Sequence, residues 1–267
     1  MEIIINKNYH NSRIDRFIRE KFSVPQNLVQ RLIREKKIKI NKKKVETSTI
    51  LNEGDVVSLY YFLEENPQHV HINPDLVQKF KSWIVFEDND VIVINKPHGI
   101  SSQGGVISGI SVDVLAKQYE IEARITHRLD RETSGIMIIA KNKYTARHIT
   151  QLFAQGLVKK KYYAMVENIT KESGVIMSDL HKDTYLQKMV VTDGNSCVTN
   201  FNAIDSKTLL VEPQTGKMHQ IRAHLAHIGM PIIGDEKYGG IQSERMCLHA
   251  FSVEFDRHTF SCECKFL

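Results

Sequence analysis

The sequence predicts an α+β fold, with a large domain on a mixed, largely antiparallel sheet behind a small N-terminal α+β domain. Basic residues gather in the first 60 positions, where Lys and Arg outnumber Asp and Glu by 13 to 7, while residues 61–267 hold 23 against 24. Residues 61–82 carry two prolines and little periodicity, as in a linker. Beyond them, strand-length apolar runs and amphipathic helices follow each other without a strict βαβ rhythm. We therefore expect an N-terminal domain over 1–62, a linker over 63–82 and the large domain over 83–267.

Composition narrows the classes of protein that this chain can represent. Its 267 residues are 42% hydrophobic and 25% charged, which is ordinary for a soluble globular protein. No apolar run reaches the ~18 residues of a membrane span, and the first residues do not resemble a secretory signal. Four scattered cysteines form neither a disulfide framework nor a zinc pattern. The sparse cysteines fit the reducing cytoplasm. Nucleotide-binding glycine loops and a GxSxG elbow are also missing, so we expect no cofactor. The chain is expected to act as a monomer.

The N-terminal segment reads as two short helices followed by strands. Ser12 is expected to cap the first helix, with Asp15 as its reciprocal partner. A break at 24–25 precedes a second helix over about 28–33. Strands are expected at 38–40 and 54–60, with a turn at 41–44 between them. The apolar positions at helical spacing in the first helix are Ile14, Phe17, Ile18 and Phe22.

The second helix and the turn carry the basic excess of this segment. "RLIREKKIKINKKK" (31–44) holds eight basic side chains and one acid. A solvated lysine-rich face would show the same run, but such density in one small module is also typical of a surface that binds phosphate backbones. "RIDRFI", "LVQRLIREKKIKIN" and "LNEGDVV" resemble the S4 RNA-binding domain over about 12–60. The resemblance implies RNA contacts from Arg31, Arg34, Lys36, Lys37, Lys42, Lys43 and Lys44.

This segment departs from the S4 pattern at its turns and at the start of its second helix. The family commonly has a glycine near 36 or 37 and Asn-Gly-Lys in the turn, where this chain has lysines and Asn41-Lys42-Lys43. Asn27 stands where the family commonly has serine. Asn41 tolerates a left-handed backbone. The turn can therefore form without its glycine.

The large domain is expected to contain these elements in order. Apolar runs around a polar turn predict a hairpin over about 83–100. Helices are expected at 111–119, at 143–156, closed by Gly156, and at 217–228. A buried strand at 135–140, a strand at 160–166 and several β-branched runs from 174 to 213 supply the sheet.

"THRLDRETSGIMIIAKN" (126–142) crowds charged and hydroxyl side chains directly before the buried strand. A loop in this place is held by the strand that follows, which fixes the side chains it presents. A lone Asp beside a strand is usually a cap or turn residue, so Asp130 needs its context to be read as functional. "HQIRAHLAH" places His219, His224 and His227 near each other, and His224 and His227 could share a helix face and bind a metal, while His219 need not join them. A metal-dependent hydrolase is therefore one alternative to histidines that are hydrogen-bonded in the structure or face RNA.

Six short stretches, which follow each other in a fixed order along the chain, determine which family the large domain resembles. They are "NKPHGI" (95–100), "HRLDRETSG" (127–135), "KKYYAMV" (160–166), "PQTGKMHQIRAH" (213–224), "GMPIIGDEKYG" (229–239) and "RMCLHA" (245–250). The chain from 83 to 255 resembles the RluA-type pseudouridine synthases, in particular the RluC- and RluD-like branch that modifies 23S ribosomal RNA. The departures are Lys217-Met218, where the family commonly has Arg-Thr, and Gln103 before Gly104-Gly105, where that branch often has His.

The resemblance implies roles for individual residues. Asp130 is the expected catalytic carboxylate, Arg222 its partner, and Tyr162 the ring that stacks on the target uracil, with Tyr163 on the opposite strand face. Arg128 and His127 are expected to reach the RNA, and Lys96 and Pro97 to shape a loop at the rim. Ile221 and Leu248 are expected to form apolar walls around the base.

The reaction that the resemblance implies needs no redox partner, because a uracil is detached from its ribose through N1 and rejoined through C5. Asp130 can attack C1′ or C6, or take a proton from C2′. Three alternatives remain at this point: a tRNA-directed synthase, an inactive RNA-binding protein, and the metal-dependent hydrolase.

Overall fold

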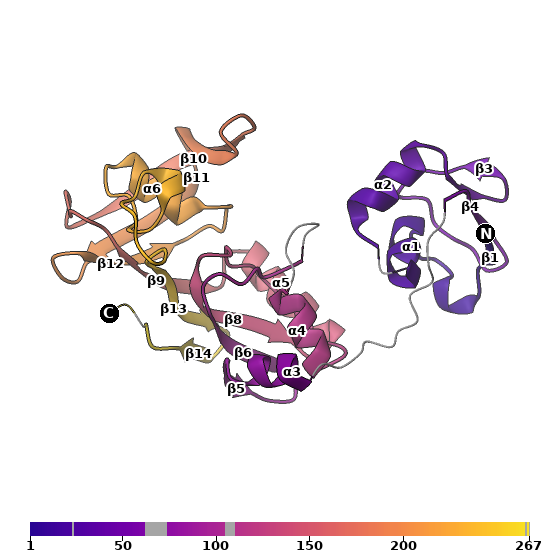
Figure 1. The fold of residues 1–267 in the computed structure, drawn as a ribbon, viewed down its shortest axis with the longest axis horizontal. Coiled ribbons are helices and arrows are strands. Elements are labelled where there is room, and N and C mark those ends of the chain that lie inside the picture. Colours follow the sequence, from indigo (N-terminus) through magenta and orange to yellow (C-terminus); the bar gives the residue numbers. More distant parts are fainter. Residues whose placement is uncertain (23, 62–73, 105–109, 265, 267) are drawn as a thin grey trace. The chain divides into compact units, whose positions relative to one another are not determined.

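The computed structural model describes residues 1–22, 24–61, 74–104, 110–264 and 266. The chain divides into two compact units, Met1–His71 and Ile72–Leu267 (Figure 1). No helix within the described ranges is long and apolar enough to cross a membrane.

The N-terminal unit confirms the predicted pair of helices followed by strands. Its elements are β1 (Glu2–Ile4), η1 (Lys7–Tyr9), α1 (Ile14–Phe22), α2 (Gln26–Arg34), β2 (Ile38–Ile40), β3 (Lys43–Lys44) and β4 (Val56–Leu59). The strands pair antiparallel in the order β1-β4-β2-β3. Both helices bury their apolar faces in one core, in which Phe17, Ile18 and Leu32 are almost fully buried. Strand β1 was not predicted, because three residues are too few to show a period.

The start of α1 differs from the prediction. The helix begins at Ile14, and the expected reciprocal capping between Ser12 and Asp15 is absent from the described part of the chain. Asp15 is buried and instead accepts hydrogen bonds from Arg13 Nη2 and Gln26 Nε2, both at 2.8 Å. A buried carboxylate requires such partners. Asp15 thus ties α1 to the first residue of α2, a contact that its sequence spacing does not reveal.

The turns of this unit keep left-handed geometry without glycine. Lys36 has φ 60°, Asn41 φ 48° and Lys42 φ 65°. The Asn41 side chain stabilises the second turn, because its Oδ1 accepts from Val56 N at 2.9 Å and its Nδ2 donates to Asp55 at 2.8 Å. The expected tolerance of Asn41 for this backbone is confirmed. At Lys36 and Lys42 the side chain makes this backbone conformation sterically unfavourable, which a glycine would avoid.

The larger unit is built on the mixed, largely antiparallel sheet that the sequence predicted. The strand order is β10-β11-β12-β9-β13-β8-β6-β5, with β14 paired to β13 and β7 to β8. The β13–β8 pair is parallel, and the remaining pairs are antiparallel. The strands are β5 (Ile84–Glu87), β6 (Val91–Lys96), β7 (Arg124–Ile125), β8 (Ser134–Ala140), β9 (Lys159–Met165), β10 (Ser173–Asp183), β11 (Lys188–Ala203), β12 (Thr208–Pro213), β13 (Leu248–Phe255) and β14 (His258–Ser261).

Strand β8 lies at the centre of the core and is buried along its whole length. Successive side chains of a strand point to opposite faces of the sheet. Met137 and Ile139 pack with helices α3 and α4 on one face, and Ile136 and Ile138 pack with α5 on the other. The helices are α3 (Pro74–Lys81), α4 (Val112–Tyr119), α5 (Lys143–Ala154), α6 (Gln220–His227) and the short η2 (Glu236–Tyr238) (Figure 1).

The predicted linker over 63–82 is wrong in its second part. Residues 63–73 lie outside the described residues, but helix α3 begins at Pro74, and Phe80 is fully buried against Trp83 and Tyr119. Proline is well accepted at the first position of a helix, and Pro74 begins α3. The linker prediction had treated this proline as a helix breaker. The predicted helix over 217–228 starts later than expected, at Gln220.

Candidate active site

A cavity of about 650 Å³ lies in the larger unit beside the loop that precedes β8. Its walls come from this loop, from α5, from β9 and from the segment leading into α6. It brings together every catalytic and substrate-binding residue that the sequence predicted, although they are up to 121 positions apart. These residues are His127, Arg128, Asp130, Tyr162, Ile221, Arg222 and Leu248.

Buried hydrogen bonds hold the loop that carries Asp130. Thr126 Oγ1 donates to the Ile138 carbonyl at 2.7 Å, which fixes the start of the loop to β8. Ser102 Oγ donates to Leu129 O at 2.6 Å and accepts from Leu129 N at 3.0 Å. Asp130 directly follows Leu129, so these bonds hold the backbone that presents its side chain. The expectation that β8 fixes the loop is confirmed, and Ser102 is a further anchor that the sequence did not indicate.

Lys96 fixes the loop from its other end. Its side chain is fully buried, and Nζ donates to the carbonyls of Pro97 at 2.9 Å, Ile100 at 2.8 Å and Arg131 at 3.2 Å. Lys96 therefore shapes the 97–100 segment from inside and joins it to the residue after Asp130. These bonds agree with the expected part of Lys96 in shaping this loop, and the amino group itself lies in the interior, where burial lowers the pKa of Lys96 to about 7.

The turn into β8 requires glycine at position 135. Gly135 has φ 117°, and a Cβ there would collide with the backbone of Ala250, its partner on the parallel strand β13. Ser134 makes long-range contacts, because its Oγ lies 2.8 Å from His249 Nδ1 and accepts from Arg245 Nη2 at 2.6 Å. These contacts differ from the local turn bonds that a serine in this place suggests.

His127 and Arg128 have different surroundings. Arg128 is exposed at the cavity, as expected for a residue that contacts RNA. His127 Nε2 accepts from Ile138 N at 2.9 Å, and the ring stacks on Phe153 at 4.4 Å. Burial lowers the pKa of His127 to about 3, so the ring is neutral near pH 7. His127 lies half-buried in the cavity wall and braces the loop, and its expected contact with RNA stays a prediction.

Asp130 and Arg222 form the predicted pair. Arg222 Nη1 lies 3.2 Å from Asp130 Oδ2. The same guanidinium makes a bidentate contact with the buried Asp235, from Nε to Oδ2 and from Nη2 to Oδ1, both at 2.7 Å. Such fork-shaped pairing fixes the plane of an arginine. Asp235 was missed, although it lies in the quoted stretch "GMPIIGDEKYG", because its role depends on a contact with another element.

His219 and Tyr238 complete the wall beside Asp130. His219 precedes α6 with a left-handed backbone, φ 53°, and its Nε2 lies 3.8 Å from Asp130 Oδ2. Its Nδ1 lies 3.0 Å from the Tyr238 hydroxyl, which also accepts from Met189 N at 2.8 Å. Burial lowers the pKa of His219, while the charge of Asp130 opposes this shift. The sequence assigned His219 no role beside Asp130.

Tyr162 lies in β9 at the register of Val211 on one side and Ala250 on the other. Burial and the negative charge of Asp130 raise the pKa of Tyr162, so its hydroxyl keeps its proton at neutral pH. Tyr163 packs against Phe251 at 4.6 Å, as its position on the opposite face predicts.

The histidines do not form the metal site that was left open. Within the described residues, no group of three or more His, Cys, Asp or Glu is arranged to hold a metal ion. His224 is fully buried, with Nε2 2.9 Å from Ser178 Oγ and Nδ1 2.9 Å from Thr199 Oγ1. Both ring nitrogens are thus in use, and the interpretation of His224 as a hydrogen-bonded structural residue is confirmed.

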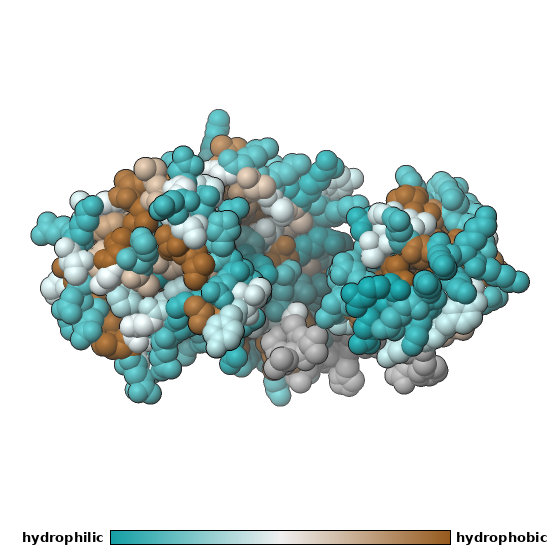
Figure 2. Space-filling model, turned by 90° about the horizontal axis from the view of Figure 1, so that it is seen from above, coloured by the Kyte–Doolittle hydropathy of each residue, from teal (hydrophilic) through white to brown (hydrophobic). Residues whose placement is uncertain are grey.

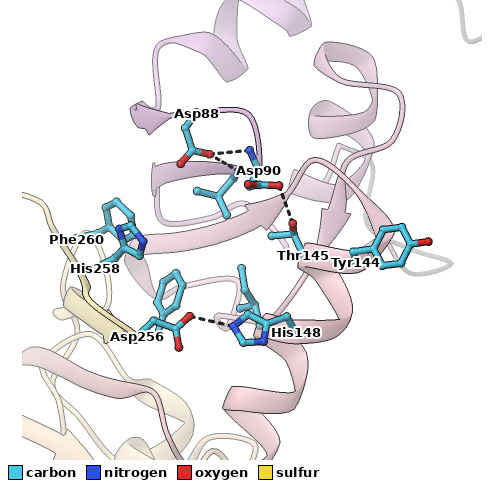
Figure 3. A pocket seen from close by; sticks show the side chains of 11 residues that line it. Asp88, Asp90, Tyr144, Thr145, His148, Asp256, His258 and Phe260 are labelled. Atoms are coloured by element: carbon cyan, nitrogen blue, oxygen red, sulfur yellow. Dashed lines mark hydrogen bonds and ion pairs between the residues drawn. The ribbon is translucent and has the colours of Figure 1, made fainter.

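A second cavity of about 360 Å³ lies where α5 meets β14 (Figure 3). In this view Asp256 faces His148, 3.0 Å away, and Asp90 holds Thr145 at 3.0 Å. His258 lies beside Phe260 with parallel rings. The lining contains none of the six quoted stretches. The larger cavity around Asp130 is therefore the candidate active site.

The basic residues of the N-terminal unit lie at its surface. All seven predicted RNA-contacting side chains are exposed except Lys37, which is half-buried beside the Tyr61 ring. Glu35 lies 3.9 Å from Arg31 and 3.7 Å from Lys37, which neutralises part of the patch. Hydrophilic side chains cover much of this unit on the face seen in Figure 2, at the right.

Comparisons with known proteins agree with this geometry. The RNA pseudouridylate synthase model matches residues 90–227, and the S4 domain model matches 12–57. Two proteins named ribosomal large subunit pseudouridine synthase C are each 31% identical over 94% of this chain. That from Buchnera aphidicola is covered over 88% of its length, and that from Rickettsia bellii over 92%.

Solved structures show the same fold. Human RNA pseudouridylate synthase domain containing 4 superposes with a TM-score of 0.57 at 26% identity, covering 72% of this chain and 92% of its own. Human RNA pseudouridylate synthase domain containing 1 gives a TM-score of 0.61 at 23% identity, covering 69% of this chain and 84% of its own. The chain belongs to the RNA pseudouridylate synthase family.

Proposed function

We propose that this enzyme converts specific uridines of 23S ribosomal RNA into pseudouridine, with Asp130 as the carboxylate that acts on the nucleoside. The observation that carries the proposal is the Asp130–Arg222 pair at 3.2 Å in a cavity that also holds Tyr162. The names of the relatives from Buchnera and Rickettsia support large-subunit ribosomal RNA as the substrate.

The Asp130 carboxylate can start the isomerisation in three ways. Attack of an oxygen on C1′ breaks the C1′–N1 bond, and uracil leaves with the electron pair on N1. Removal of the C2′ proton instead forms a C1′–C2′ double bond as the same C1′–N1 bond breaks. In the third route the oxygen adds to C6 of the base, the C1′–N1 bond then breaks, and the C6–O bond breaks again after the base has been rejoined. In all three, C5 bonds to C1′, which displaces the carboxylate in the first route and is accompanied by return of the C2′ proton in the second. The C5 proton is lost and N1 takes up a proton, so atoms and charge balance without an oxidant or an energy source.

The cavity suits a base that has been rotated out of an RNA stack. Its volume of about 650 Å³ lies in the ordinary range for a small-molecule site. Ile221 and Leu248 supply buried apolar walls, and Tyr162 supplies an aromatic ring. Extruding a base costs about a few kcal/mol, and contacts of this kind offset it. Arg128 is exposed and lines the cavity, which supports the proposal that it contacts the displaced strand or its phosphates.

The N-terminal unit is proposed to supply sequence-independent attraction to RNA. It contains the S4 match, and the predicted basic side chains lie at its surface. Phosphate contacts of this kind position a protein without reading sequence. We further propose that the enzyme acts as a monomer in the cytoplasm without a cofactor. Cys197, Cys247 and Cys262 are free thiols, which agrees with a reducing compartment.

Mapping pseudouridines in cells tests the substrate. RNA from a strain lacking this gene is compared with RNA from the same strain complemented by the wild-type or the Asp130→Asn chain. We expect specific 23S sites to lose pseudouridine and to regain it only with the wild-type chain. Loss confined to tRNA would assign the alternative substrate. An unchanged map, or full rescue by Asp130→Asn, would contradict the proposed activity.

A further inference from the structure

The two oxygens of Asp130 have different surroundings. Arg222 Nη1 at 3.2 Å and His219 Nε2 at 3.8 Å both approach Oδ2. Within the described part of the protein, no side chain donates a hydrogen bond to Oδ1 or forms an ion pair with it. The carboxylate is therefore held by one oxygen and leaves the other for a substrate.

The contacts of Tyr238 decide which nitrogen of His219 carries the proton. The Tyr238 hydroxyl accepts the Met189 N–H at 2.8 Å, so its own hydrogen needs an acceptor. His219 Nδ1, at 3.0 Å, is the acceptor that the structure offers among the described residues. A neutral imidazole that accepts at Nδ1 carries its hydrogen on Nε2. The hydrogen therefore points from His219 toward Asp130.

We propose that His219 is a positioning residue of the active site, which Tyr238 holds as the Nε2–H tautomer, and that His219 and Arg222 bind Asp130 Oδ2 so that Oδ1 is the reacting oxygen. The inference rests on the proposed role of Asp130. At 3.8 Å the contact is longer than a hydrogen bond, and a shortening of about 0.6 Å brings it to the usual upper limit. Active-site hydrogen bonds commonly tighten in this way when a substrate is bound.

The backbone and the local charges support this arrangement. His219 has a left-handed backbone, φ 53°, a conformation that few residues adopt freely, and its ring lies between the Tyr238 hydroxyl and Asp130. Desolvation lowers the pKa of His219, and the cations Arg222 and Lys237 lower it further. Asp130 and Asp235 oppose them. The neutral form thus prevails near pH 7, and it can donate only through the nitrogen that Tyr238 does not use.

Nitrogen NMR reads the tautomer without any turnover. With the full chain carrying ¹⁵N-labelled histidine, the His219 signals are assigned by their absence from the His219→Asn spectrum. The wild-type spectrum is expected to show a protonated Nε2 and an unprotonated Nδ1. Tyr238→Phe should convert this into a mixture of tautomers. A wild-type signal with the proton on Nδ1, or a tautomer ratio unchanged in Tyr238→Phe, would overturn the inference.

Two substitutions at position 219 separate the Nε2 donor from the backbone. Asparagine accepts a left-handed backbone and reproduces Nδ1, but it places no donor where Nε2 lies. Glutamine reaches the Nε2 position with its amide. We expect His219→Asn to lower kcat by about tenfold or more with KM nearly unchanged, and His219→Gln to stay within about threefold of wild type.

The outcomes distinguish this inference from the function on which it rests. Wild-type kcat in His219→Asn, together with an inactive Asp130→Asn, would remove His219 and leave the function intact. An active Asp130→Asn would contradict the function itself. Equal loss in both position-219 variants would mean that a hydrogen-bond donor is not what the site needs from His219. Unfolding followed by Trp83 fluorescence checks that the variants are folded.

Discussion

Arg222 faces two carboxylates with different exposure, and its removal should separate stability from catalysis. The Arg222 side chain is 8% exposed, that of Asp235 1% and that of Asp130 28%. In Arg222→Met, the buried Asp235 carboxylate loses both of its guanidinium contacts. Asp130 loses one contact but remains open to water.

The size of the effect follows from that difference in burial. Removing one partner of a buried ion pair costs about 3–5 kcal/mol, because the other charge stays desolvated. Against a typical total of about 5–15 kcal/mol, this is a large part of the stability of a domain. In the double variant Arg222→Met/Asp235→Asn no unpaired charge remains in the interior, so most of the lost free energy of unfolding should return. Asp130 still lacks its partner, so turnover should stay severely reduced.

Trp83 makes the stability measurement specific to the catalytic unit. It is the single tryptophan of the chain, and its ring contacts Phe80 in the core of that unit. Urea unfolding followed by its fluorescence gives the free energy for each variant, and tritium release from RNA labelled at uridine C5 gives turnover. The matched control is Asp235→Asn alone, which keeps Arg222 beside Asp130.

Three results would refute this reasoning. Wild-type stability in Arg222→Met would mean that Asp235 is not desolvated as its burial indicates. A double variant as unstable as the single one would place the cost in lost packing. Near wild-type turnover in the double variant would show that Asp130 works without its guanidinium partner.

Other properties of the molecule lead to further predictions. Burial holds the pKa of His127 at about 3 and those of His224 and His249 at about 4, so the unfolded chain binds protons below pH ~6.5 that the native one does not. The free energy of unfolding should be fully present above that pH and fall as pH drops toward 4, and a smaller pH slope in His224→Asn checks this. Lys36→Gly and Lys42→Gly should each stabilise the N-terminal unit by about 0.5–1 kcal/mol, because glycine adopts positive φ freely. The melting temperature, measured without RNA, should therefore rise; an unchanged melting temperature would mean that these positions are unstrained. Deleting residues 1–71 should weaken RNA binding and flatten its dependence on salt between about 50 and 300 mM, whereas an unchanged slope would mean that the basic patch is not an RNA-binding surface.

Local pattern was enough to predict much of this fold. The all-apolar run of β8 and the helical spacing in α1 follow from side chains that each element must bury by itself. The predicted linker was wrong at Pro74, because proline is as suitable for starting a helix as for interrupting one. The predicted capping role of Asp15 was also wrong, because its partner Gln26 is eleven positions away and belongs to another helix.

The candidate site shows the same limit. Asp130, Arg222 and Tyr162 could be named because they lie in stretches that resemble a family, and the structure places all three at one cavity. Asp235 and Tyr238 act through contacts with Arg222 and His219 that arise only after α6 and η2 have packed together. Sequence spacing does not encode such contacts. The residues that form the site could therefore be predicted from the sequence, and the residues that support them could not.

Tritium release by Asp130→Asn tests the central claim most directly. The substitution keeps the size of the side chain and removes its charge, while the basic surface of the N-terminal unit is untouched. With 23S ribosomal RNA labelled at uridine C5, we expect the wild-type chain to release tritium and Asp130→Asn to release none, with RNA affinity largely retained. Release by Asp130→Asn within about tenfold of the wild-type rate would contradict the assignment of Asp130 as the catalytic carboxylate.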